Sequence, residues 1–228
     1  VWVFFHIPPG VDTYSSALVT HRLAIVPYLT PAMRDRFVAV LARSAGHIAL
    51  AVAGHTHKFA FRIVNATGPQ PVPMLLVPAL SPVYGNRPSF LTGNVTAGGT
   101  LRDVEERSFG RGAWRDIGGM PSLGVDAFTG ANLVALQRRL ARDPHVRATF
   151  ERLYGGGAQP EINPRNWSIY WCAATAFATT AFRECSQSGG ISVITRRGLL
   201  VVAIPVVILL LAAGAFVGWR VRRRKLRL

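Results

Sequence analysis

Three histidines lie where apolar runs of the chain end, and two of them are only one residue apart. His55 and His57 flank Thr56 after the apolar run 48–53, and Gly54 lets the backbone turn sharply there. Along an extended backbone alternate side chains point the same way, so both rings are expected to face one cavity. Imidazole is the commonest metal ligand in proteins, and ligands usually bind at strand ends of α/β sheets. The pattern predicts a metal site; the simpler interpretation is a polar loop with two solvated rings.

The third histidine, His6, ends another apolar run. Residues 1–7 are rich in aromatic and β-branched side chains, which favours a buried strand, and the Pro-Pro-Gly sequence that follows must break it. Thr30 and Pro31 fit the N-cap and first position of a helix that leads to the second run. Strand, helix and strand in this order predict the crossover unit of a layered α/β sheet.

The two histidine motifs carry a resemblance to a known family. His6-Ile7-Pro8-Pro9-Gly10 and Gly54-His55-Thr56-His57 resemble the calcineurin-like metallophosphoesterases. Segment 81–88, Ser-Pro-Val-Tyr-Gly-Asn-Arg-Pro, is similar to a loop of the acid sphingomyelinase and acid sphingomyelinase-like phosphodiesterase branch. The resemblance covers residues 1–110 well and residues 110–190 loosely.

The resemblance implies a function and residues that perform it. It implies a metal-dependent phosphodiester hydrolase, sphingomyelin phosphodiesterase-like, that takes a lipid or nucleotide diester and two divalent metal ions, with zinc expected. His6 and His55 would bind one metal ion and His57 the other. Tyr84 and Asn86 would line the substrate pocket, although segment 81–88 is equally readable as a plain turn.

The same family carries Asp-x-His, Gly-Asp-x-x-Asp and Gly-Asn-His motifs in the first half of its catalytic domain, and none of them stands ahead of His6. We therefore expect this sequence to be a C-terminal portion that does not complete a two-metal site by itself and is inactive alone. A catalytically inactive, membrane-tethered relative with a binding or structural role is the alternative. A phosphatase or nucleotide hydrolase on the same fold is a third possibility.

The remaining pattern predicts an α/β metallophosphoesterase sandwich, present in its C-terminal half, with a helical subdomain after it. Strands are expected at 59–64 and 74–77, a hairpin turn at 97–100, and a glycine-rich loop at 110–125. Helices are expected at 132–142, 144–154 and 163–177. The predicted parts are 1–110, the C-terminal half of the catalytic domain; 111–190, the helical subdomain; 199–219, a transmembrane helix; and 220–228, a basic cytoplasmic tail.

The only cysteines, Cys172 and Cys185, are 13 residues apart. One straight helix would separate them by about 20 Å, whereas a disulfide needs Cα atoms within about 7 Å. Either the chain reverses between them or both are free; the resemblance favours a bridge, and with it an oxidising compartment. Three Asn-x-Ser/Thr triplets, at Asn65, Asn94 and Asn166, are compatible with glycosylation.

Residues 199–219 carry no charge and are long enough to cross a bilayer core of about 30 Å. Two arginines precede this segment and six basic residues follow it, so the positive-inside rule places the C-terminus in the cytoplasm. The sequence thus predicts a single-pass membrane protein with its catalytic part in a lumen or outside the cell. These eight flanking basic residues contribute much of the net charge of +15. Nucleic-acid binding is not expected, because no basic patch is interleaved with aromatic residues.

Overall fold

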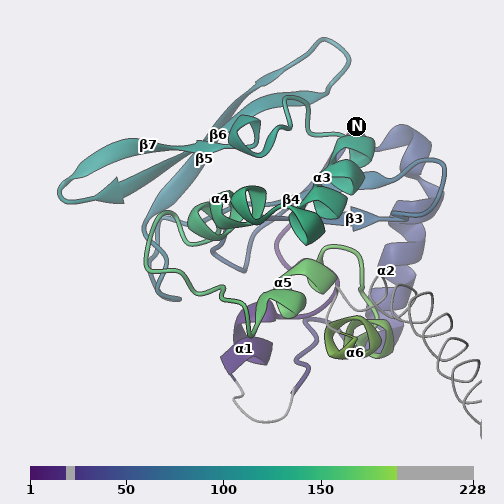
Figure 1. Cartoon of the computed structure of the whole chain (residues 1–228). Helices are drawn as coiled ribbons and strands as arrows, with labels where there is room; N and C mark the ends of the chain where they lie inside the picture. The colour runs from purple at the N-terminus through teal and green to yellow at the C-terminus, as the bar shows by residue number, and fades with distance from the viewer. Residues whose placement is uncertain (19–23, 189–228) are drawn as a thin grey trace, which may run out of the picture. The chain divides into compact units, whose positions relative to one another are not determined.

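The computed structural model describes residues 1–18 and 24–188 (Figure 1). Residues Val1–Gly190 form one compact unit. The predicted transmembrane helix at 199–219 lies, with the basic tail after it, outside the described residues. In the part of the chain that is described, no helix is both long and apolar enough to cross a bilayer. The described part is a mixed α/β structure, as the sequence predicts.

A four-stranded sheet carries the histidine motifs. Its order is β1-β2-β4-β3, with β1, β2 and β4 parallel and β3 antiparallel to β4. Helix α2 (Pro31–Arg43) connects β1 to β2, so the predicted strand–helix–strand unit is confirmed. The predicted strands at 59–64 and 74–77 correspond to β3 and β4. The four strands are β1 (Trp2–Phe5), β2 (Leu50–Ala53), β3 (Ala60–Val64) and β4 (Val72–Leu76).

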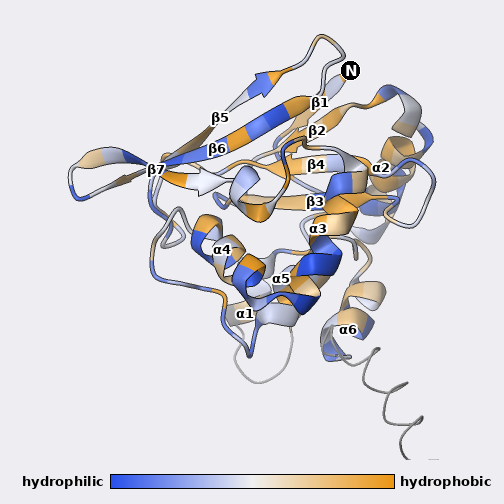
Figure 2. Cartoon of the chain, turned by 45° about the horizontal axis from the view of Figure 1, so that its top comes forward, coloured by the Kyte–Doolittle hydropathy of each residue, from blue (hydrophilic) through white to orange (hydrophobic). Residues whose placement is uncertain are grey.

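The two faces of this sheet enter separate apolar cores, because successive side chains of a strand point to opposite faces. On one face Ala51 packs with Leu41 of α2. On the other face Phe61 packs with helical residues such as Leu136 and Phe150, and the Phe61 and Phe150 ring centroids are 6.0 Å apart. Figure 2 shows the strands of this sheet mostly in the orange of apolar residues. Most of the helical residues in the second core belong to α3 (Gly130–Arg142), α4 (Pro144–Tyr154) and α5 (Trp167–Ala173).

Local capping signals start the helices where the sequence predicts. The Thr30 side chain accepts from the Met33 amide at the start of α2. The Asp143 side chain accepts from the amides of His145 and Val146 at the start of α4. Such caps satisfy backbone donors that have no partner within the helix. The other helical segments of the described residues are α1 (Thr13–Leu18), α6 (Thr179–Gln187) and two 3-10 turns, Ala45–His47 and Pro121–Leu123.

Cys172 and Cys185 form a disulfide with Cα atoms 5.8 Å apart. Cys172 lies in α5 and Cys185 in α6, so the chain reverses between them. The predicted bridge is confirmed, and it fastens α6 to the second core.

A second sheet is antiparallel in the order β5-β6-β7. The predicted turn at 97–100 connects β5 (Ser89–Val95) to β6 (Leu101–Gly110). The predicted loop at 110–125 is wrong over β7 (Ala113–Gly119), which pairs with β6. Gly119, one of the glycines that suggested a loop, is needed by the strand, since a Cβ there would lie 1.9 Å from the Val104 carbonyl oxygen. The domain boundary expected near residue 110 thus falls inside this sheet.

Glu106 of β6 is fully buried, and neither of its carboxyl oxygens has a hydrogen-bond partner among the described residues. The hydroxyl of the neighbouring Ser89 donates instead to the Arg87 carbonyl. Burial raises the pKa of Glu106 to about 8, against smaller opposing effects of Ser89 and Arg152. The folded state therefore favours the protonated carboxyl at neutral pH.

The native chain is expected to lose stability as the pH rises and Glu106 ionises, and Glu106→Gln is expected to remove this loss. The pKa of Glu106 is higher in the folded chain than in the unfolded chain. The stabilising contribution of the Glu106 carboxyl group is therefore complete below about pH 4.5 and disappears as the pH rises through about 8. The change amounts to about 5 kcal/mol at most. We expect urea unfolding from pH 5 to 9 to show the native chain losing stability relative to Glu106→Gln. The exposed Glu184→Gln serves as control, and a pH-independent difference for Glu106→Gln would contradict the burial argument.

Candidate metal centre

His6 and His55 meet where β1 and β2 end. The strands are parallel with Phe5 opposite Ala53, so the residues that follow them emerge side by side. The Gly54 amide donates to the His6 carbonyl at 3.1 Å. His55 Nδ1 lies 3.3 Å from His6 Nε2, and the ring centroids are 5.1 Å apart at 83°. The structure thus brings together two of the three predicted ligands from segments 49 residues apart in sequence.

The loop that carries His55 and His57 is not extended, which corrects the geometry expected from the sequence. Their φ angles are 67° and 55°, in the left-handed region that non-glycine residues rarely adopt. The Thr56 amide donates to the Gly54 carbonyl at 2.8 Å, and the Thr56 hydroxyl contacts the Lys58 backbone. Such strained backbone persists where surrounding contacts hold it, and it is concentrated at functional sites.

His57 occupies a different setting from the other two histidines. Its ring lies edge-on to Tyr84 with centroids 5.1 Å apart. Its Nδ1 atom is buried and has no hydrogen-bond partner among residues 1–18 and 24–188. An imidazole nitrogen in this state lacks the partner that buried polar atoms normally have, and a metal ion is one group that would supply it.

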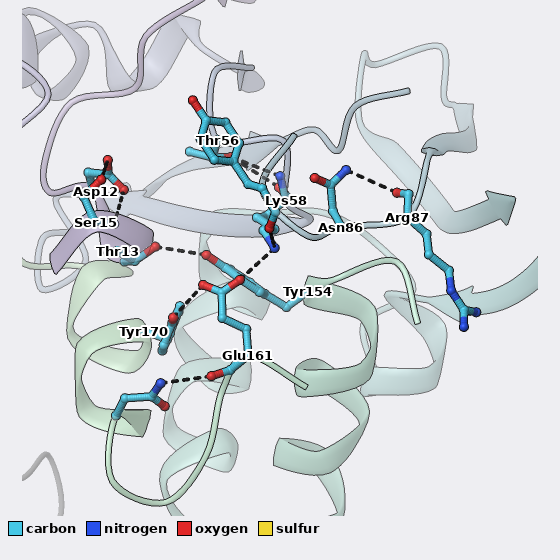
Figure 3. Close-up of polar contacts among 12 residues, drawn as sticks. Asp12, Thr13, Ser15, Thr56, Lys58, Asn86, Arg87, Tyr154, Glu161 and Tyr170 are labelled. Carbon is cyan, nitrogen blue, oxygen red and sulfur yellow. Dashed lines mark hydrogen bonds and ion pairs between the residues drawn. The ribbon is translucent and has the colours of Figure 1, made fainter. Parts of the chain in front are cut away.

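A small hollow opens beside His55. Tyr28 packs edge-on against His55 at 5.3 Å, and Tyr14 contacts Tyr84 at 5.2 Å. The Asn86 side chain is buried and donates to the carbonyls of Ser81 and Arg87, so it braces the loop that carries Tyr84 rather than lining the hollow (Figure 3). The lining residues are Asp12, Thr13, Tyr14, Tyr28, His55, Thr56, Tyr84 and Tyr154.

The His6–His55 pair fits a zinc ion in its spacing. Two nitrogen ligands at about 2.0–2.1 Å from a tetrahedral zinc are about 3.3–3.4 Å apart, which agrees with the observed 3.3 Å. Within the described ranges, however, no three His, Cys, Asp or Glu side chains form a group that could hold a metal ion. The residues present therefore fit part of a coordination shell: two ligands at one position and the unpartnered His57 nitrogen near Tyr84.

Directly after the histidine loop, Lys58 is 2% exposed and makes an ion pair at 2.7 Å with Glu161 (Figure 3). Its ammonium group also donates to the Tyr84 carbonyl at 2.8 Å and lies 5.6 Å from the centre of the Tyr154 ring. Tyr170 donates to the other Glu161 oxygen at 2.7 Å. This network connects the histidine loop to the Tyr84 loop and to α4 and α5, so it holds the histidine loop in place.

Sequence reasoning missed this ion pair, because its members are 103 residues apart. One signal was present: Lys58 is one of only two lysines in a chain that otherwise uses arginine. Lysine offers a compact charge that a small buried pocket can enclose, whereas a guanidinium group is wider and planar.

The asparagines of the three glycosylation triplets and the Asp-x-His triplet at 143–145 lie at the surface or have structural roles. Asn65 and Asn94 are exposed, whereas the half-buried Asn166 side chain donates to the Glu161 carbonyl and accepts from the Asn163 amide. An Asp-x-His triplet does occur in the chain, at 143–145, but its aspartate caps α4. It contributes nothing to the candidate site.

Searches of protein-family models and of curated proteins gave no match. The likeness to the metallophosphoesterases therefore depends on the motif residues alone.

Lys58→Met is expected to destabilise the fold by about 3 kcal/mol, because it leaves the Glu161 carboxylate without its buried partner. Arg107→Ala is the matched control: it breaks the Arg107–Asp116 pair, whose side chains are 51% and 55% exposed, and is expected to cost less than about 1 kcal/mol. Adding Glu161→Gln to Lys58→Met is expected to restore part of the loss, since no unpaired charge remains. Equal unfolding free energies for Lys58→Met and Arg107→Ala would contradict this role.

Proposed function

We propose that this chain is part of a metal-dependent phosphodiester hydrolase of the calcineurin-like kind, related to the acid sphingomyelinase branch, with a layered α/β sandwich. The observation that carries the proposal is the 3.3 Å separation of His6 Nε2 and His55 Nδ1 at two paired strand ends. Support also comes from the order of the two histidine motifs and from the parallel pairing of β1 and β2, the strands that precede them.

Each histidine has a defined role in this proposal. His6 and His55 present their ring nitrogens to one metal ion, and His57 presents its unpartnered Nδ1 to the other. Divalent zinc, when bound, would supply Lewis-acid stabilisation of the charge that develops on the phosphoryl oxygens. Tyr28 and Tyr84 restrict the rings of His55 and His57 by edge contacts. The described residues contain no group of three potential ligands, so the ligands that complete both coordination shells would come from other parts of the protein.

The proposed substrate is a phosphodiester, which the hollow beside His55 would receive. The lining includes Tyr14 and Tyr84, whose hydroxyls can hydrogen-bond to phosphoryl oxygens without repelling them. The one carboxylate there, Asp12, is occupied by the Ser15 amide and hydroxyl. Tyr84 would contact the substrate directly, and Asn86 would fix the loop that carries it.

We further propose that the domain lies in a lumen or outside the cell, attached through the transmembrane helix expected at 199–219. The disulfide between Cys172 and Cys185 supports this compartment, because such bonds persist in oxidising environments. The exposed positions of Asn65 and Asn94 are compatible with glycosylation there.

A second candidate is a catalytically inactive relative that binds a partner or ligand through the same fold. One observation favours it: in the described part of the chain, no three potential ligands form a metal-holding group. A phosphatase or nucleotide hydrolase with the same histidines is a third candidate, which differs only in substrate.

Substituting the paired histidines tests the metal proposal. His6→Ala and His55→Ala are each expected to weaken zinc binding at least about 100-fold, since loss of a direct ligand exceeds the 10- to 100-fold cost of losing an outer one. His145→Ala, at an exposed position of α4, should leave affinity unchanged. Zinc affinity is measured by competition with a chromogenic chelator.

Hydrolysis by the full-length protein distinguishes the three candidates. Metal-dependent cleavage of bis-p-nitrophenyl phosphate or sphingomyelin, abolished by His55→Ala and His57→Ala, is the expected result. Turnover of only p-nitrophenyl phosphate or ATP would favour the third candidate, and zinc binding without any turnover the second. Undiminished diester cleavage in both variants would refute the proposed role of these histidines.

A further inference from the structure

Three aromatic side chains form an exposed cluster on one face of the second sheet. Phe90, Phe109 and Trp114 are 38%, 40% and 46% exposed. The Trp114 ring centroid lies 5.0 Å from that of Phe90 and 5.4 Å from that of Phe109. Phe109 and Trp114 are directly opposite each other in the β6–β7 pairing. Their contacts stabilise the hairpin, yet much of the apolar ring surface stays open to solvent.

Three arginines gather at the same end of the sheet. Arg111 and Gly112 form the two-residue turn between β6 and β7, with φ angles of 53° and 77°. Arg111 also lines a hollow together with Arg87 and Arg115. None of these three guanidinium groups has a hydrogen bond or ion pair to another described residue. Figure 3 shows the Arg87 side chain extending away from the polar network around it. These arginines therefore remain available for an anionic ligand.

The position and charge of this hairpin end suit an extended surface. Figures 1 and 2 both show the end of the β6–β7 hairpin projecting beyond the helices. Residues 107–116 contain three arginines and one aspartate, a net charge of +2. Trp and Phe are typical apolar side chains of protein segments that insert at the boundary between lipid headgroups and acyl chains, and arginine binds phosphate through paired hydrogen bonds.

We propose that the end of the β6–β7 hairpin is a docking surface for a bilayer that contains anionic phospholipids. The hairpin end enters the bilayer surface edge-on. Phe109 and Trp114, on one face of the sheet, enter the headgroup boundary, while Arg87, Arg111 and Arg115, around the hollow on the other face, bind the phosphate groups. The combination of exposed aromatic rings with unpaired arginines favours a lipid surface as the partner, because an anionic bilayer offers an apolar interior and negative charge together. This proposal is independent of the histidine site and of any metal ion.

Hydrogen–deuterium exchange of the full chain tests the proposal, because it locates lipid contact within the sequence. Vesicles of phosphatidylcholine with about 30% phosphatidylserine are expected to slow exchange at residues 109–115, and pure phosphatidylcholine vesicles are not. Arg111→Gln/Arg115→Gln is expected to raise the lipid concentration for half-maximal protection about 25-fold, since each basic residue near such a surface contributes about fivefold in affinity. The effect is read at the hairpin, and the native chain and its variants share residues 199–219, so association through that segment is common to all of them and cancels in the comparison.

Arg138→Gln/Arg142→Gln is the matched control, with the same loss of charge at exposed positions of α3. It should leave hairpin protection by anionic vesicles within about twofold of the native chain. Three results would overturn the proposal: no protection at 109–115, equal protection by neutral vesicles, or equal losses in the two double variants. The aromatic cluster would then serve only to stabilise the hairpin.

Discussion

Parallel pairing of β1 with β2 is the constraint on which the candidate site depends. Parallel strands bring their carboxyl ends to one sheet edge, and the register of Phe5 with Ala53 places His6 beside Gly54 and His55. A Cβ at position 54 would lie 3.4 Å from His6 Nδ1, in van der Waals contact with it, so the Gly54 backbone runs directly beside the His6 ring. The connection through α2 fixes this pairing, because a helix packed on the sheet face returns the chain in the same direction.

Around this edge, charged groups are buried in order to fasten loops. Lys58 and Glu161 connect the histidine loop to the helices, and the buried Arg62 of β3 donates to the carbonyls of Val11 and Ala173. Burial lowers the pKa of Arg62, with nearby Tyr28, Tyr154 and Asp12 opposing that effect. A buried charged pair adds little stability by itself, yet removing one partner destabilises the fold strongly. Such pairs therefore favour a single arrangement of the loops.

Local signals in the sequence predicted much of the fold. The caps at Thr30 and Asp143 and the apolar runs of β1 and β2 each act over a few residues, and their elements were correctly placed. β7 was missed because its glycines conceal a strand that exists through pairing with β6. The Lys58–Glu161 pair and the left-handed backbone of His55 were missed because contacts distant in sequence determine them.

In the proposed site, the imidazoles of His6 and His55, at the ends of β1 and β2, hold one metal ion between them. X-ray absorption at the zinc edge of the zinc-loaded protein counts these ligands directly. The account predicts imidazole scattering from nitrogens at about 2.0–2.1 Å, reduced by two rings in the His6→Ala/His55→Ala variant and unchanged in His145→Ala. A shell of oxygen ligands alone, or the same imidazole signal in the double variant, would contradict it.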